Sequence, residues 1–220
     1  MFFNEETRLV EDHVEIDEEQ LRHMARDVCS GIRRIYLHWT AGHYGQVYDH
    51  YHLNIDRNGQ IYVACKTLMD IKDHTWQRNH GAIGITLCCG VDAGCWNPTR
   101  LAAWDVDTAY EAPHKPQPDA ALVDFGPEPP TPIQVEKMAE VVAILCDELY
   151  LPIDEETVMT HCEAAFEDGY GPGDDDPDMH WDLWFLPDAA LHGELYPGGD
   201  LIRGKAIFYQ RAMAAENAAK

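Results

Sequence analysis

Three residues with metal-binding side chains stand out because of the stretches that carry them. His38 follows the apolar run 35–37 and precedes the small residues 40–42, which is the pattern of a buried strand that ends in a loop. His161 lies in a second strand-like stretch, and Asp176 precedes a proline. Two imidazoles and one carboxylate, with a fourth position left for water, make a catalytic rather than a structural zinc site. The alternative for each lone strand histidine is a hydrogen-bonded core residue.

Segments around these residues resemble one enzyme family, motif by motif and in the family's order. HWTAG at 38–42 is similar to the HxTAG signature of the zinc-dependent N-acetylmuramoyl-L-alanine amidases, a superfamily that also contains amidase-type phage endolysins and peptidoglycan recognition proteins. The resemblance covers roughly residues 33–186. The further matching segments are YHLNIDRNGQIY at 51–62, NHGAIGITL at 79–87, PTPIQ at 130–134, HCE at 161–163, and DP at 176–177 followed by HWD at 180–182.

The resemblance implies a fold, a metal and a set of site residues. The implied fold is an α/β single domain with a central mixed β-sheet flanked by helices. The implied cofactor is zinc, held by His38, His161 and Asp176. Tyr51 corresponds to a tyrosine that serves catalysis in some members, and a half-buried strand aromatic is the alternative reading. The candidate substrate-binding residues are Trp39, Asn79 and Thr86.

The segment that leads to the third ligand is longer than the family usually shows. Residues 164–173 therefore carry an insertion, and Asp174, Asp175 and Asp178 lie close to Asp176. The resemblance selects Asp176, and a solvated acidic loop is the interpretation for the other three carboxylates.

Two positions depart from the family pattern. Many members carry glutamate where this chain has Thr86, and some carry lysine where this chain has Asp174. A threonine cannot act as a general base, and an aspartate cannot supply positive charge to an oxyanion. We therefore predict an altered proton route through Glu163 or His74. A weak enzyme and a pure binding protein remain as alternatives.

The chain is strongly acidic. It has 39 Asp and Glu residues against 16 Lys and Arg residues, a formal net charge of −23 and a pI near 4.6. Such a surface repels phosphate backbones, so we expect no nucleic-acid partner. No apolar run approaches the length that spans a bilayer, so we expect no membrane partner either. The resemblance implies peptidoglycan or a muropeptide as the partner.

The first residues carry neither the basic segment nor the apolar segment of a Sec signal peptide. We expect cytoplasmic synthesis without a signal peptide. A cell-wall substrate would then be reached by release on lysis, by delivery to the wall, or as recycled fragments inside the cell. Phage or host origin and the oligomeric state stay open.

The expected organisation has three regions. Residues 1–30 form an acidic extension and a helix, residues 31–190 form the zinc amidase domain, and residues 191–220 form a helical extension. Residues 92–130 are rich in proline and aromatic residues, and we read them as an irregular insertion that forms an ordered flap over the cleft.

Local signals predict the main elements of the domain. Asp17 and Thr131 are expected N-caps, each with glutamine three residues on. An Asn-Gly turn at 56–59 predicts a hairpin, and the apolar run 82–88 predicts a central strand. A last helix at about 203–217 is expected to pack outside the shared core.

Together these features predict zinc-dependent hydrolysis of the amide between N-acetylmuramic acid and L-alanine. One alternative is a peptidoglycan-binding module that keeps the fold without turnover. Another is a zinc amidohydrolase whose insertion reshapes the pocket for a different peptide or acyl amide. A structural zinc protein is poorly supported, because no fourth side-chain ligand stands in a matching context.

Overall fold

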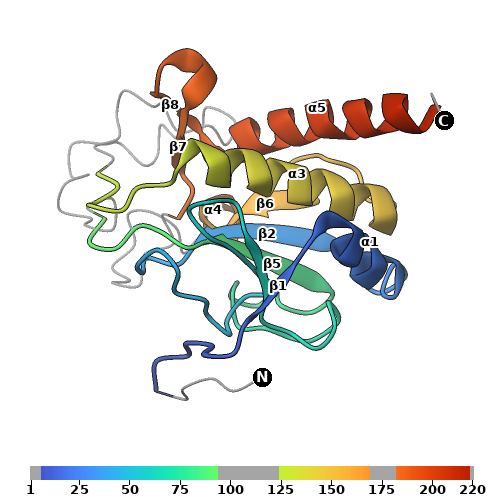
Figure 1. Cartoon of the computed structure of the whole chain (residues 1–220), viewed down its shortest axis with the longest axis horizontal. Helices are drawn as coiled ribbons and strands as arrows, with labels where there is room; N and C mark the ends of the chain where they lie inside the picture. Colours follow the sequence, from blue (N-terminus) through green and yellow to red (C-terminus); the bar gives the residue numbers. More distant parts are fainter. Residues whose placement is uncertain (1–5, 94–123, 169–181, 219–220) are drawn as a thin grey trace.

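The computed structural model describes residues 6–93, 124–168 and 182–218, and it confirms the predicted α/β fold with a central mixed sheet (Figure 1). In chain order the elements are β1 (Val14–Ile16), α1 (Glu18–Arg26), β2 (Arg34–Trp39), β3 (Leu53–Ile55), β4 (Ile61–Val63), β5 (Ala82–Leu87), α3 (Pro132–Leu149), β6 (Val158–Thr160), α4 (His161–Asp168), β7 (Phe185–Asp188), the 3-10 helix η4 (Ala189–Leu191), β8 (Glu194–Pro197) and α5 (Gly198–Ala218).

The main sheet has the strand order β1-β4-β3-β5-β2-β6. Its centre is parallel: β2 pairs with β5 on one side and with β6 on the other, and β3 also runs parallel to β5. β4 and β1 add antiparallel strands at one edge. The predicted turn before β4 is confirmed, with Gly59 at a φ of 82° that suits glycine. Strands β7 and β8 form a separate antiparallel pair.

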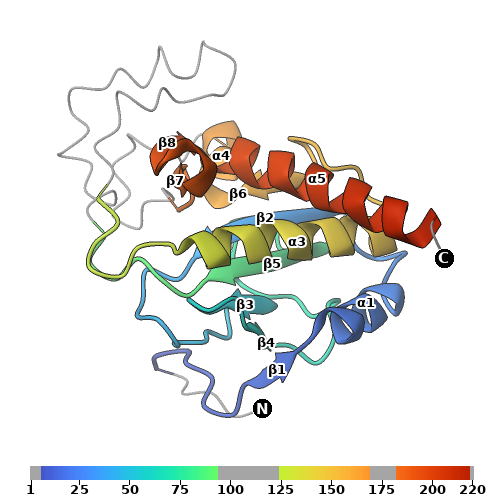
Figure 2. The same cartoon turned by 45° about the horizontal axis from the view of Figure 1, so that its top comes forward.

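Helices α1, α3 and α5 pack against one another in a layer over one face of this sheet (Figure 2). Both predicted N-caps are confirmed: Asp17 starts α1 and Thr131 starts α3, each in a capping box with the glutamine three residues on. Pro132 occupies the first turn of α3, where a missing backbone N–H leaves no hydrogen bond unmade.

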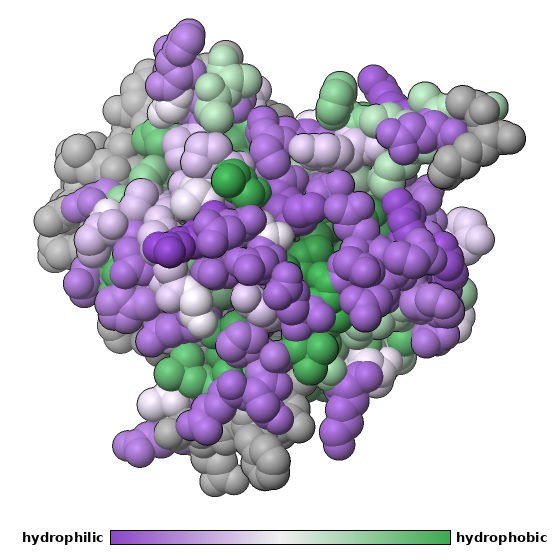
Figure 3. All heavy atoms as spheres, viewed as in Figure 1, coloured by the Kyte–Doolittle hydropathy of each residue, from purple (hydrophilic) through white to green (hydrophobic). Residues whose placement is uncertain are grey.

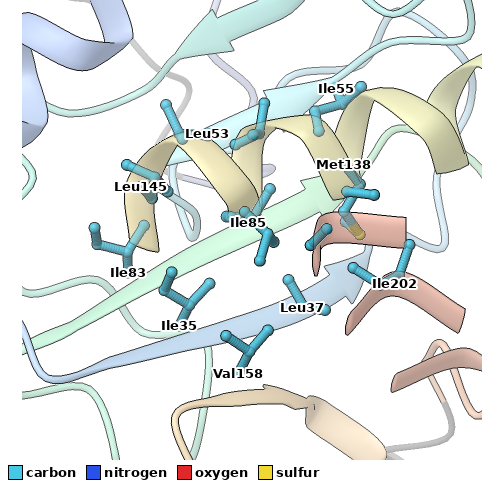
Figure 4. Packing of buried hydrophobic residues seen from close by; sticks show 14 of the residues in the cluster. Ile35, Leu37, Leu53, Ile55, Ile83, Ile85, Met138, Leu145, Val158 and Ile202 are labelled. Carbon is cyan, nitrogen blue, oxygen red and sulfur yellow. The ribbon is translucent and has the colours of Figure 1, made fainter. Parts of the chain in front are cut away.

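The hydrophobic core lies between the sheet and this helix layer. Alternate residues of β2 and β5 point toward α3, because successive side chains of a strand face opposite sides (Figure 4). The residues labelled in this core are Ile35, Leu37, Leu53, Ile55, Ile83, Ile85, Met138, Leu145, Val158 and Ile202.

Three expectations from sequence need correction. The stretch before α1 is not only an acidic extension, because Val14–Ile16 forms β1 and pairs with β4. The last helix begins earlier than predicted and does not lie outside the core, since Ile202 and Ala206 are fully buried in it. His161 is the first residue of α4 rather than the end of a strand. The expected flap falls largely on residues 94–123, outside the described residues.

Hydrophilic residues dominate the surface that Figure 3 shows, in keeping with the strong excess of acidic side chains. Among the described helices, none has the length and apolar composition needed to cross a membrane.

Candidate metal centre

Three ionisable side chains from three distant segments meet beneath the sheet, on the face opposite to the helix layer. His38 comes from β2, His161 from the start of α4, and Asp182 from the residue range just before β7. His38 Nδ1 lies 2.9 Å from Asp182 Oδ2, and His161 Nδ1 lies 3.2 Å from Asp182 Oδ1. One donor atom from each residue falls within 4.8 Å of the other two.

This group could hold a metal ion. Two imidazole nitrogens and one carboxylate oxygen are a ligand set that zinc accepts, and three protein ligands are typical of a catalytic zinc site. His38 is fully buried, and Asp182 is only 4% exposed. His161 is 13% exposed at its side chain, so it is the most exposed of the three.

The carboxylate at the middle of the group is ionised. Burial by itself would raise the pKa of Asp182, but the charge of His161 and the hydrogen bonds to both histidines outweigh it and hold this pKa below its ordinary value. A buried anion between two imidazoles favours a cation at the same place.

A loop after β4 forms the next wall of the centre. Thr75 Oγ1 lies 3.4 Å from His38 Nε2 and 2.9 Å from His74 Nδ1. The Asn79 side-chain oxygen accepts the backbone N–H groups of His74, at 3.2 Å, and of Thr75, at 2.8 Å. Asn79 therefore fixes the loop that places two side chains beside His38.

The His74 ring packs tightly on β5. It lies 5.3 Å from the His38 ring, centre to centre, and a Cβ on Gly84 would come within 2.7 Å of it. Burial lowers the pKa of His74 well below its ordinary value, and the neighbouring histidines His38, His52 and His161 lower it further. The ring is therefore neutral at pH 7.

Tyr51 completes the wall on the side of β3. Its ring centre lies 5.0 Å from that of His38, and its hydroxyl donates a long hydrogen bond of 3.4 Å to the Trp39 carbonyl. Burial raises the pKa of Tyr51, and the charge of Asp182 raises it further, while a hydrogen bond with Thr86 opposes them. The hydroxyl therefore keeps its proton and serves as a donor.

A family model described as N-acetylmuramoyl-L-alanine amidase matches residues 25–178. The chain belongs to this amidase family. Membership supports an amidase acting on peptidoglycan in general, and the matched range contains His38 and His161. Neither the curated proteins nor the solved structures contain a match to the chain.

The structure brings together several of the residues that the sequence predicted for this amidase-family site. His38 and His161 face the same carboxylate, and Tyr51, His74 and Asn79 surround them. Thr86 is directly opposite His38 in the β2–β5 register, so both point to the same face. Thr86 is fully buried and lies beneath the centre, close to Tyr51.

Two predicted site residues have other roles in the structure. Trp39 follows His38 in β2 and so faces the opposite side of the sheet, where it is 2% exposed within the core. It is not placed to bind a substrate at this centre. Glu163 is held by the guanidinium of Arg203 at 2.8 and 2.9 Å and accepts the Thr160 N–H at 2.8 Å. These contacts make Glu163 a structural residue rather than a proton carrier.

The predicted third ligand, Asp176, lies outside the described residues. The carboxylate that contacts both histidines is Asp182, which belongs to the matching segment HWD at 180–182 but is not among the predicted ligands. A signal for it exists in the sequence: Asp182 stands between Trp181 and the apolar residues 183–186. A carboxylate in such an apolar context must be paired when it is buried.

Proposed function

We propose that the protein is a zinc-dependent N-acetylmuramoyl-L-alanine amidase that cleaves the amide between the lactyl group of N-acetylmuramic acid and L-alanine. The observation that carries the proposal is the buried group of His38, His161 and Asp182 in a chain of this amidase family. His38, His161 and Asp182 would hold the zinc ion, which when bound would supply a more acidic water and a Lewis acid for the scissile carbonyl.

The side chains around the centre supply what amide hydrolysis requires. Attack on the carbonyl creates negative charge on its oxygen, and a positioned donor stabilises that charge. Tyr51 lies beside His38 and carries a protonated hydroxyl, so it is the donor that we assign. Asn79 acts indirectly, because its side chain fixes the loop that bears His74.

The general base differs from the glutamate that many relatives use. Thr86 occupies the corresponding position and cannot accept a proton at neutral pH. Of the two predicted proton carriers, Glu163 is bound to Arg203, whereas His74 lies next to His38. We therefore assign the transfer of the proton to His74. Its Nε2 is buried and has no hydrogen-bond partner within the described part of the chain, so this nitrogen is free to accept a proton.

The test is to incubate zinc-loaded protein with purified peptidoglycan and with a soluble muramyl peptide, and to identify the products by mass spectrometry. We expect release of stem peptides that begin with L-alanine, from wild type and from His23→Ala. His23 is an exposed residue of α1 and serves as the matched control for His161→Ala, which should release none. Comparing the two substrates separates a wall-degrading enzyme from one that acts on fragments. Binding without cleavage in zinc-loaded wild type would replace this proposal with a binding module.

A further inference from the structure

A buried arginine of the C-terminal helix reaches the strand–helix junction that carries His161. Arg203, on α5, is 6% exposed. Its guanidinium donates to the Val158 carbonyl of β6 at 2.9 Å and to both carboxylate oxygens of Glu163 at 2.8 and 2.9 Å. It also contacts Asp200 at 2.9 Å. A bidentate arginine–carboxylate pair in a buried setting fixes both partners in position.

The partner of Arg203 in turn fixes the first turn of α4. Glu163 accepts the backbone N–H of Thr160 at 2.8 Å, and the Thr160 hydroxyl accepts the backbone N–H of Glu163 at 3.1 Å. This reciprocal arrangement is a capping box. His161 lies inside it, so the direction of the His161 side chain depends on contacts that Arg203 holds in place.

The start of α5 also touches the segment that carries Asp182. The Gly198 N–H donates to the Trp184 carbonyl at 2.8 Å, and a Cβ on Gly198 would come within 1.9 Å of the Leu183 carbonyl oxygen. A Cβ on Gly199 would come within 2.2 Å of the Glu163 carboxylate. Only glycines permit α5 to approach both ligand-bearing segments so closely.

We propose that the first two turns of α5 position the metal ligands His161 and Asp182, with Arg203 as the principal positioning residue. This inference rests on the metal centre of the proposed function. Arg203 lies beyond residue 178, where the match to the family model ends, so the C-terminal helix adds to the site something that the matched region does not contain.

The experiment measures zinc affinity rather than turnover. Zinc is titrated into metal-free protein in competition with a chromophoric chelator, at a temperature where circular dichroism shows every variant to be folded. Arg203→Met should weaken zinc binding by about 10- to 100-fold, as is typical for residues that orient metal ligands. Arg203→Lys keeps the charge but loses the bidentate contact, and should also weaken binding.

The matched control is Lys205→Met on the same helix. Lys205 forms ion pairs with Glu136 at 2.8 Å and Asp188 at 3.3 Å, away from α4. The Lys205→Met substitution removes a cation from α5 but should leave zinc affinity at the wild-type value, even where it lowers stability. Glu163→Gln should weaken zinc binding as Arg203→Met does, and the double variant should weaken it no further, because the two residues act as one unit.

The outcomes separate this inference from the proposed function. If wild type binds no zinc, the metal centre itself fails and the inference fails with it. If wild type binds zinc and Arg203→Lys binds it equally tightly, only the positioning role is overturned. If Arg203→Met does not fold, Arg203→Lys and Glu163→Gln decide the matter. Equal weakening by Lys205→Met would reduce the effect to general stability and would also overturn the proposal.

Discussion

The two faces of β2 differ in what they bury and in what that burial accomplishes. Ile35 and Leu37 point toward α3 and are fully enclosed by apolar side chains. Tyr36 and His38 point the other way, toward imidazoles, hydroxyls and a carboxylate. Both faces are equally inaccessible to water. Burial on the helix face stabilises the fold by removing apolar surface from water, whereas burial on the other face costs free energy for each polar group that lacks a hydrogen-bond partner.

The polar face is filled by groups whose hydrogen bonds connect the strands with the loops. Asn54 exchanges hydrogen bonds with the backbone of Tyr48, at 2.9 and 3.2 Å. His52 accepts the Gly84 N–H at 3.0 Å and contacts the Asp70 carbonyl at 2.7 Å. One short strand therefore separates two tasks. The odd-numbered residues of β2 contribute to the hydrophobic core, and the even-numbered residues face the site.

The largest expected effect is on activity, from the polar face. His38→Ala removes one of three proposed metal ligands, so zinc binding should be lost and peptide release from peptidoglycan should fall to background. The fold should remain, because the apolar face is untouched. Zinc content of the purified variant, circular dichroism and the peptide-release assay measure these three properties. Full activity in this variant would remove His38 from the centre.

The neighbouring residue should show the opposite behaviour. Leu37→Ala leaves a cavity in the core and should lower the free energy of unfolding by about 2–5 kcal/mol. Its zinc affinity and its turnover per folded molecule should stay at wild-type values. Denaturant titration gives the stability change, and the same assays as for His38→Ala give the rest. Loss of zinc at temperatures where Leu37→Ala is folded would show that the two faces are not independent.

A third prediction concerns the acid response of the polar face. Burial, with a smaller contribution from the charge of Lys72, lowers the pKa of His52 from 6.5 to about 4 against the opposing effect of Asp70. Between about pH 6.5 and pH 4, His52 is protonated in the unfolded chain but neutral in the folded chain. The free energy of unfolding therefore falls as the pH decreases through this range. Below about pH 4, His52 has lowered the free energy of unfolding by about 3 kcal/mol, because one pKa unit corresponds to about 1.4 kcal/mol.

His52→Gln has no titrating group at this position and should flatten that part of the stability–pH profile. The control is His23→Gln on the exposed surface of α1, which should leave the slope as in wild type. Urea titrations at several pH values between about 4 and 7 measure both slopes. Equal slopes in wild type and His52→Gln would contradict the assignment.

The smallest effect is expected where the polar face is packed most tightly. Gly84→Ala adds a methyl group within 2.7 Å of the His74 ring, which must then move. We expect a loss of about 1–3 kcal/mol in stability, together with a lower kcat and unchanged zinc affinity, because His74 is not a ligand. Gly204→Ala on α5 is the control, since open space surrounds that position. An unchanged kcat in Gly84→Ala would exclude His74 from the proton route.

Much of the fold could be predicted because its signals are local. The proline after Thr131 and the capping glutamine three residues on fix the start of α3, and the Asn58-Gly59 pair fixes the β3–β4 turn. β1 was missed because an edge strand of three residues carries almost no periodicity. His161 was assigned to the wrong kind of element because β6 ends one residue earlier and the capping box of α4 begins there.

The site was harder to predict because its geometry depends on contacts that are distant in sequence. The two histidines stand in strong motifs, but several aspartates follow His161 within a short stretch, and spacing does not tell which of them meets it. The segment that carries Asp182 is held at the start of α5, where the Gly198 N–H donates to the Trp184 carbonyl at 2.8 Å. Glu163 was predicted to carry a proton, and only the structure reveals Arg203, 40 residues away in sequence, as its partner.

The most direct test of the metal centre is a crystal structure of the zinc-loaded protein with anomalous diffraction recorded at the zinc absorption edge. We predict one strong anomalous peak per chain, bounded by His38, His161 and Asp182. A peak bounded by Asp176 in place of Asp182 would restore the ligand that the sequence suggested. A zinc-loaded crystal with no peak between the two histidines would show that His38 and His161 are not metal ligands.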